Sequence, residues 1–419
     1  MPKEISDTKT HQSRREFLKA STLGIAGAGL AGGLTFPAIL RAQEKGPIKV
    51  GILHSLSGTM AISEAPIKEV VLMALEEINK AGGVKGRPLE AVYVDTAGKP
   101  DVTRSTVERL SQRQDILFIW GESTSAAGIV AAQVAQRNKI VFFTHVAAAP
   151  DLTSKGWDWV FRQNPMTIEY TLALYDYLLK VVKPKSIFSV YENTLFGQSN
   201  NGAMKAFAEK NGIRYMSEGF EGGSQDYKPT LIKVKAADPD MVFFAAYLLD
   251  ALLLTRQSSE LELKPRLFTS AGAGFIFPEY LEGAGKAAEN YFSAALWAPD
   301  LPYPGARDFD AKWRKANNGK QAVYMHASAY SSGYVIADIL KRAKAFPREA
   351  VKEAFAATDI KTAYGPVKFI SYERDGVTFR NQNKLPTILV QAQGGKWVSV
   401  WPPDLATGKP AFPVPGLKP

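Results

Sequence analysis

Short apolar runs alternate along the chain with segments in which apolar residues recur three and four positions apart. Runs of the first kind predict buried strands, and segments of the second kind predict amphipathic helices. The first unit starts with an apolar run at residues 50–53, continues through a loop of small polar residues at 54–62, and has helical periodicity from Ile67 to Ile78. Open α/β sheets bind small molecules at the carboxyl ends of their strands. The loop at 54–62 is therefore a candidate binding loop.

Residues that favour helix boundaries mark the ends of this first helix. Ser63 suits an N-cap, and Pro66 then falls in the first turn, where its missing N–H costs nothing. Gly82 and Gly83 end the helix, and residues 89–95 predict a second strand. The unit is therefore a strand, a helix and a second strand.

The same alternation continues along the chain, and no other fixed-period repeat accompanies it. Residues 306–358 are mostly helical in pattern, whereas residues 386–393 and 396–400 predict a final hairpin. Further apolar runs that predict strands lie at residues 116–120, 140–143, 186–190, 241–246 and 267–269. The pattern as a whole predicts an α/β protein.

Composition narrows the class of protein. The 419 residues are 46% hydrophobic and 22% charged, which indicates a chain with a sizeable core and enough length for two lobes. The net charge of +10 is spread along the chain without a run of Lys and Arg, so we expect no nucleic-acid partner. Cysteine is absent and there are four His, which argues against disulfides, metal sites and thiol chemistry.

Residues 1–42 have the pattern of a twin-arginine signal peptide. Ser-Arg-Arg-Glu-Phe-Leu-Lys at 13–19 precedes a weakly apolar segment at 20–34, and we place the cleavage after Ala42. The segment matches GxGxxG at residues 27–32, but no strand precedes it, so we interpret this match as part of the signal. The apolar part is short and Gly-rich for a permanent membrane span. We therefore expect the twin-arginine translocase to export the chain to the periplasm.

The first unit also carries a family resemblance. VGILHSLSGTMAISE at 50–64 and MALEEINKAGG at 73–83 resemble the periplasmic binding proteins of ABC importers for branched-chain amino acids, amides and urea, the leucine-binding-protein-like family. The resemblance extends over most of the chain after residue 45. It implies the type I periplasmic-binding-protein fold, in which two doubly wound parallel-sheet lobes of α/β class are joined by three crossing hinge segments.

This resemblance also implies a domain organisation and a function. We expect crossings at residues 161–165, 291–296 and 364–369. The expected parts are lobe 1 at 46–163 and 296–365, lobe 2 at 164–295 and 366–402, and an irregular tail at 403–419. A monomer of this kind would capture a small organic ligand between its lobes and deliver it to the permease subunits of an ABC importer in the inner membrane. The alternative is a ligand sensor of the same fold that signals to a membrane receptor.

The strand-end loops supply the candidate binding residues. Ser123, Thr124 and Ser125 precede a predicted helix, whose free backbone N–H groups together with the hydroxyls favour ligand oxygen atoms. The alternative is that one of them only caps that helix. The resemblance matches Ser125 to a serine that holds the ligand carboxylate. In the second lobe, it matches Phe196 to an aromatic residue that packs on the ligand. The expected ligand contacts are Ser63, Ser123, Thr124, Ser125, Thr144, His145, Val146, Ala148, Phe196, Tyr247 and Ala271.

Two departures from the family pattern bear on the ligand. Ala148 stands where the resemblance implies a threonine, and Ala271 stands where it implies an acid that pairs with the ligand ammonium. A buried ammonium without an acidic partner is costly. Unless Asp250 or Glu192 substitutes, we expect a ligand with an oxygen-rich end and an apolar or aromatic body, such as an amide or a carboxylate, rather than a zwitterionic amino acid. His145 either donates to such a ligand or makes only local bonds.

An enzyme is the rival class of protein. The sequence has no GxSxG elbow, no phosphate-binding loop of the Walker type and no HExxH. Glu122 next to Ser123 resembles a base and a nucleophile, but no third residue in the pattern orients them. We therefore predict a binding protein without catalytic residues, metal or cofactor.

Overall fold

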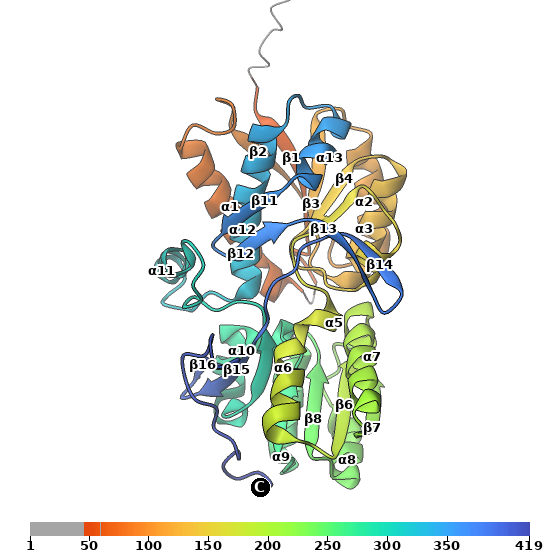
Figure 1. The fold of residues 1–419 in the computed structure, drawn as a ribbon, viewed down its shortest axis with the longest axis vertical. Helices are drawn as coiled ribbons and strands as arrows, with labels where there is room; N and C mark the ends of the chain where they lie inside the picture. Colours follow the sequence, from red (N-terminus) through yellow and green to blue (C-terminus); the bar gives the residue numbers. More distant parts are fainter. Residues whose placement is uncertain (1–45, 59) are drawn as a thin grey trace, which may run out of the picture. The chain divides into compact units, whose positions relative to one another are not determined.

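The computed structural model describes residues 46–58 and 60–419, so the predicted signal peptide lies outside the described residues. Two sheets of seven strands each organise residues 46–419 (Figure 1), and we call the elements around them lobe 1 and lobe 2. This confirms the predicted fold class of two α/β lobes. In the part of the chain that the structure describes, no helix is both long and apolar enough to cross a bilayer.

The sheet of lobe 1 has the strand order β13-β14-β5-β4-β3-β1-β2. Neighbouring strands are parallel except for the antiparallel pair β13–β14 at one edge. The strands are β1 (Ile48–His54), β2 (Leu89–Asp95), β3 (Ile116–Gly121), β4 (Val141–Thr144), β5 (Val160–Arg162), β13 (Ile370–Arg374) and β14 (Val377–Gln382). The helices are α1 (Ala61–Lys80), α2 (Pro100–Ser111), α3 (Ser125–Arg137), α4 (Asp151–Ser154), α12 (Tyr324–Arg342) and α13 (Arg348–Ala356).

The sheet of lobe 2 has the order β16-β15-β10-β9-β8-β6-β7, and only its β15 and β16 pairings are antiparallel. The strands are β6 (Ser186–Glu192), β7 (Arg214–Phe220), β8 (Met241–Ala245), β9 (Leu267–Ser270), β10 (Phe292–Ala295), β15 (Ile388–Gln393) and β16 (Lys396–Trp401). The helices are α5 (Thr167–Tyr170), α6 (Leu172–Tyr177), α7 (Leu195–Lys210), α8 (Lys228–Ala237), α9 (Leu248–Glu260) and α10 (Pro278–Ala284), with short helical turns η1 (Leu178–Val182), η2 (Ala273–Ile276) and η3 (Gly285–Ala288).

A connecting region of helix α11 (Ala306–Ala316) and the small sheet of β11 (Asp359–Thr362) and β12 (Gly365–Lys368) completes the elements. The strand orders require the chain to pass between the two sheets three times: after β5, after β10 and after β14. The third passage differs from the expectation. Gln382 of β14 pairs with Arg162 of β5, so residues 370–382 extend the first sheet, whereas the sequence assigned them to lobe 2. The open edge of β5 accepts this hairpin, and the chain leaves lobe 1 only after Gln382.

Helix α1 shows how the core holds the loop after β1 in place. Its apolar stripe, predicted from Ile67 onwards, is buried. Among the helices, α1 packs most extensively against α12. The predicted start of the helix was wrong, because α1 begins at Ala61 with Met60 at the N-cap position. Ser63 lies inside the first turn, where its hydroxyl donates to the Met60 carbonyl at 3.0 Å. The earlier start places Ser63 and Glu64 on the buried face of the helix.

Candidate functional site

The carboxyl ends of β1, β2, β3 and β4 bring several buried polar side chains together at one edge of the lobe 1 sheet. Gly121 ends β3 with φ +122, and a Cβ there would lie 2.2 Å from the Leu53 carbonyl oxygen, so only glycine fits this position. The next residue, Glu122, is fully buried. The tight turn therefore directs a carboxyl group into the interior of lobe 1.

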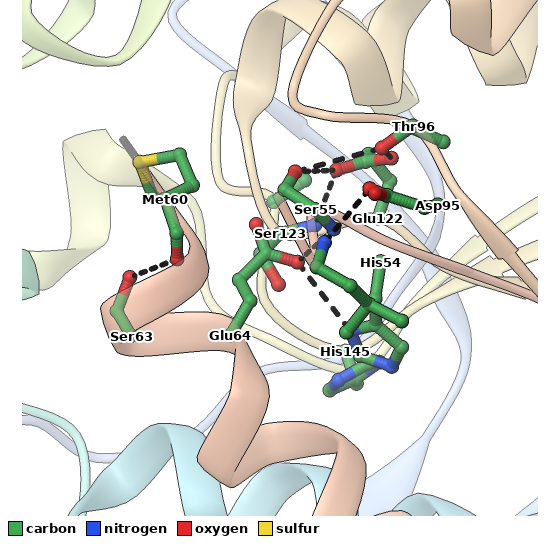
Figure 2. A network of polar contacts seen from close by, with 12 residues as sticks. His54, Ser55, Met60, Ser63, Glu64, Asp95, Thr96, Glu122, Ser123 and His145 are labelled. Atoms are coloured by element: carbon green, nitrogen blue, oxygen red, sulfur yellow. Dashed lines mark hydrogen bonds and ion pairs between the residues drawn. The ribbon is translucent and has the colours of Figure 1, made fainter. Parts of the chain in front are cut away.

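Glu64 of α1 and Glu122 form a buried pair of carboxyl groups with an extensive hydrogen-bond network (Figure 2). Glu122 accepts from the Thr96 hydroxyl at 2.8 Å and from the Ser55 hydroxyl at 3.3 Å. Glu64 Oε2 accepts from the Ser55 backbone N–H at 2.9 Å and lies 3.4 Å from His54 Nδ1. Ser55 thus links the two carboxyl groups.

Burial and the neighbouring Glu64 carboxylate raise the pKa of Glu122 to about 8. Glu122 is therefore mostly protonated at neutral pH. Burial, with a smaller effect of His54, lowers the pKa of His145 well below its usual range. His145 is therefore neutral, and its Nδ1 accepts from the Trp120 indole N–H at 3.1 Å.

The loop that leads into α3 carries hydroxyl groups without protein partners. Thr124 stands at the N-cap position, yet its side chain makes no capping hydrogen bond. Within residues 46–58 and 60–419, the buried hydroxyls of Ser123 and Thr124 have no hydrogen-bond partner. Buried polar groups are nearly always paired. These two hydroxyls therefore favour the interpretation of a ligand site over that of a simple helix cap.

Ser125 has a different role from its two neighbours. Its hydroxyl oxygen accepts from the backbone N–H groups of Ala148 and Ala149 at 3.3 and 3.1 Å. Ser125 therefore ties the loop after β3 to the loop after β4, and its predicted contact with the ligand stays a prediction. Thr144 is also engaged locally, because its hydroxyl donates to the Glu122 carbonyl at 3.1 Å.

Lobe 2 faces these loops with aromatic and apolar groups. The Phe196 and Tyr247 rings stack with centroids 5.5 Å apart. A Cβ on Gly274 would lie 2.3 Å from the Tyr247 carbonyl carbon, so this glycine lets the turn η2 pack directly against the start of α9. Tyr247 and η2 form one wall as a result.

Between the two lobes lies a small enclosed cavity of about 20 Å³, the volume of roughly one water molecule. The cleft is therefore closed in this structure. Of the predicted residues, Ser63, Ser123, Val146 and Tyr247 line the cavity; Thr124, Ser125, Thr144, His145, Ala148, Phe196 and Ala271 do not. Its other lining residues are Met60, Glu64, Ile67, Leu248, Ala273, Gly274, Phe277 and Met325.

Sequence reasoning missed Glu64 and Phe277. Glu64 lies three positions before Ile67 and continues the buried stripe of α1, but the stripe was predicted from its apolar residues, which begin at Ile67. Phe277 follows η2 in a short irregular segment that has no periodic pattern.

Two substitutes that the sequence offered for the missing acid lie elsewhere. Asp250 accepts from the Tyr227 hydroxyl at 2.6 Å and from the Gly223 N–H at 3.0 Å, which accounts for its carboxylate locally. Glu192 accepts from the Tyr247 N–H at 3.3 Å and does not line the cavity. Burial and, to a lesser extent, the Asp250 charge raise the pKa of Glu192 to about 7.

Comparison with known proteins places the chain in a family. A family model described as "Periplasmic binding protein" matches residues 47–396. The chain is 26% identical over 389 residues to "Leu/Ile/Val-binding protein homolog 7" of Brucella abortus (strain 2308), an alignment that covers 89% of this chain and 96% of the relative. The chain belongs to the periplasmic binding protein family, as the resemblance in its first unit indicated.

Solved structures of low sequence identity share the fold. The branched-chain amino acid substrate-binding protein LivJ of Streptococcus pneumoniae, in complex with isoleucine, gives a TM-score of 0.73 at 20% identity and covers 84% of this chain and 99% of its own. A solute-binding protein of R. palustris, in complex with benzoate, gives a TM-score of 0.72 at 18% identity and covers 84% and 95%. One ligand is an amino acid and the other lacks an ammonium group, so the shared fold does not choose between them.

Proposed function

We propose that the protein is a periplasmic solute-binding receptor that captures a small organic ligand between its lobes and delivers it to the permease of an ABC importer. The ligand class is an amino-acid-like molecule, an amide, or an aromatic or short-chain carboxylate. Family membership supports this class of function, and the chain carries no pattern of an enzyme.

One observation carries the proposal: buried polar groups that have no hydrogen-bond partner among the described residues meet an aromatic wall at the same closed cavity. Ser123 contributes an unpaired hydroxyl from lobe 1, while Tyr247 and Phe277 line the opposite side from lobe 2. Leaving a buried hydroxyl unpaired costs about 1–3 kcal/mol. A ligand that pairs this group and contacts both walls binds the closed form better than the open form, and so drives closure.

The functional groups divide by lobe. Free N–H groups at the start of α3, together with the hydroxyls of Ser123 and Thr124, suit a carboxylate or carbonyl oxygen. Tyr247 and Phe277 suit an apolar body. A ligand larger than the present cavity can enter only if the lobes first rotate apart by a small angle. The three connecting segments absorb this rotation.

A ligand screen on the purified chain tests the proposal. The panel contains leucine, isoleucine, phenylalanine, 4-methylpentanoate, 3-phenylpropanoate, benzoate, acetamide and urea, read first by thermal shift and then by calorimetry. We expect at least one compound to raise the melting temperature, because a ligand at 100 times its Kd stabilises the folded state by about 2.7 kcal/mol.

A matched pair of variants locates the site. Tyr247→Ala removes one wall of the cavity and should weaken binding of the best compound by tenfold or more, since the loss of roughly 60 Å² of apolar contact costs about 1.5 kcal/mol. Leu249→Ala changes an exposed residue two positions further on and should bind like the wild type. If no compound binds, or if both variants bind equally, the proposed cleft is wrong.

A further inference from the structure

Glu64 is a buried carboxylate with one oxygen atom left unpaired at the cavity. Its side chain is fully buried, and it lines the space between the lobes. Oε2 accepts the Ser55 N–H and lies near His54, whereas Oε1 has no hydrogen-bond partner within the described ranges 46–58 and 60–419. An unpaired carboxylate oxygen is a strong acceptor that lacks its donor.

Basic side chains near Glu64 are scarce in the described part of the chain. Among the described residues, no Lys or Arg forms an ion pair with it, and His54 at 3.4 Å is its one basic neighbour within ion-pair distance. The other carboxyl group of the network, Glu122, supplies no positive charge in either protonation state. A buried charge without a full partner is costly in a low-dielectric interior. A cation that enters the cavity would remove this cost.

The nearby groups indicate the rest of such a ligand. Ser123 lines the same cavity, and its hydroxyl has no hydrogen-bond partner in the part of the chain that the structure describes. It immediately precedes Thr124, the N-cap residue of α3. This end of the cavity favours a carboxylate, whereas Glu64 favours a positively charged donor. Ser123 and Glu64 both belong to lobe 1 and lie beside each other (Figure 2).

We propose that Glu64 Oε1 binds the ammonium group of the ligand, and that the protein therefore selects α-amino acids over the corresponding des-amino acids. This inference rests on the proposed function and narrows its ligand class. It also reverses the expectation from Ala271, because the acid that is absent from lobe 2 is supplied by the first helix of lobe 1.

The position of Glu64 has a mechanical consequence. Both charged ends of the amino acid contact lobe 1, so the charged groups can be recognised before the lobes close. Tyr247, Leu248 and Phe277 of lobe 2 then cover the side chain, and they report its size and shape. Discrimination for the amino group thus belongs to lobe 1, and discrimination for the side chain belongs to lobe 2.

Paired ligands measure this preference directly. Leucine is compared with 4-methylpentanoate, and phenylalanine with 3-phenylpropanoate, by calorimetry at pH 7 on the purified wild-type chain. The members of each pair differ in the ammonium group alone. We expect the better-bound amino acid to bind at least tenfold more tightly than its partner, since charge-assisted hydrogen bonds are the stronger kind.

Two isosteric variants assign the preference to one residue. Glu64→Gln keeps an oxygen for the Ser55 N–H and removes the charge, and it should reduce the preference to less than threefold while leaving the affinity for the des-amino acid within threefold. Glu192→Gln makes the same chemical change at a buried carboxyl of lobe 2 outside the cavity, and it should retain the preference. Melting temperatures of all three proteins report folding.

The outcomes separate this inference from the proposed function. Equal or tighter binding of the des-amino acid by the wild type, a preference that survives in a folded Glu64→Gln protein, or a preference that is lost in Glu192→Gln instead would overturn the role of Glu64 while the cleft stands. If Glu64→Gln does not fold, the wild-type ligand pairs decide. Binding of no compound in the full panel would overturn the proposed function and this inference together.

Discussion

The buried carboxyl group of Glu122 makes the stability of the protein depend on pH. Its pKa is raised from 4.5 to about 8 in the folded protein, so between these values the folded state holds a proton that the unfolded state releases. Stability from this group is therefore fully present below pH 4.5 and is lost as the pH rises through about 8. Glu122→Gln carries an uncharged group at every pH and lacks this dependence.

We expect the wild type to lose stability relative to Glu122→Gln by a few kcal/mol, on the order of what such a shift implies, as the pH rises from about 5 to about 8. Urea unfolding of both proteins across this range measures the difference. A difference that stays constant with pH would show that Glu122 is already ionised in the folded protein.

Ser123 and Ser125 lie two positions apart, but replacing each with alanine should change a different property of the protein. Ser125→Ala removes the acceptor of two buried N–H groups, so we expect it to lower the free energy of unfolding by about 1–3 kcal/mol. Ser123→Ala breaks no hydrogen bond within the described part of the chain, so stability should stay within about 0.5 kcal/mol while ligand affinity falls.

Urea unfolding and calorimetry on both variants test this contrast, and each serine serves as the control for the other. Loss of stability in Ser123→Ala, or unchanged stability in Ser125→Ala, would contradict the roles that the hydrogen bonds indicate.

At the scale of elements, the crossing segments are held by a buried arginine that forms no ion pair with an Asp or Glu of the described residues. Arg162 of β5 is fully buried and donates from Nε to Gln382 Oε1 at 2.5 Å and from a terminal nitrogen to the Ala149 carbonyl at 2.5 Å. Burial lowers the pKa of Arg162 to about 10. Gln382 in turn donates to the Asn164 carbonyl at 2.9 Å, so one amide joins β14 to the first crossing.

Gln382→Ala should therefore destabilise the protein by about 3 kcal/mol, because it leaves a buried guanidinium N–H without an acceptor. Arg380→Ala, on the same strand, removes only an exposed ion pair with Asp158 and should cost less than about 1 kcal/mol. Chemical denaturation of the two variants compares them. Equal losses would mean that the arginine finds another acceptor when Gln382 is absent.

Local sequence patterns predicted the helices and strands. The placement of the β13–β14 hairpin could not be predicted in this way, because it depends on contacts between residues far apart in the sequence. The apolar runs and the stripe from Ile67 to Ile78 are properties of neighbouring residues, so strands and helices could be placed from them. The hairpin β13–β14 joins lobe 1 through one pairing between Gln382 and Arg162, which are far apart in the chain. The role of Glu64 depended on a helix that starts three residues earlier than Ser63 at the N-cap suggested.

At the scale of the whole molecule, export depends on the N-terminal segment. The twin arginines at 14 and 15 lie outside the described residues, and their role rests on the sequence pattern alone. Replacing both with lysine, Arg14→Lys with Arg15→Lys, should block passage through the twin-arginine route, since this pair is the recognised element. Fractionation of cells with an antibody against the protein measures it. Normal accumulation of the double variant in the periplasm would contradict the assignment.

The last prediction concerns closure of the two lobes. The present cavity of about 20 Å³ has room for roughly one water molecule, so an amino acid enters only when the lobes have moved apart. A ligand that contacts both lobes then stabilises the closed form by its differential affinity. We expect small-angle scattering to show a smaller radius of gyration with saturating ligand than without it. Hydrogen exchange should slow at residues 163–166 and 383–387, which belong to the first and third passages between the lobes.

Calorimetry at several temperatures should also give a negative heat-capacity change, because closure buries the apolar wall of Tyr247, Leu248 and Phe277. Tyr247→Ala at the same ligand concentration is the control, and its radius should stay nearer the ligand-free value because less of the wall is available to favour the closed form. An unchanged wild-type radius, with ligand binding confirmed by heat, would mean that the ligand binds without a change in the angle between the lobes. In that case the crossings would act as fixed connections and not as hinges.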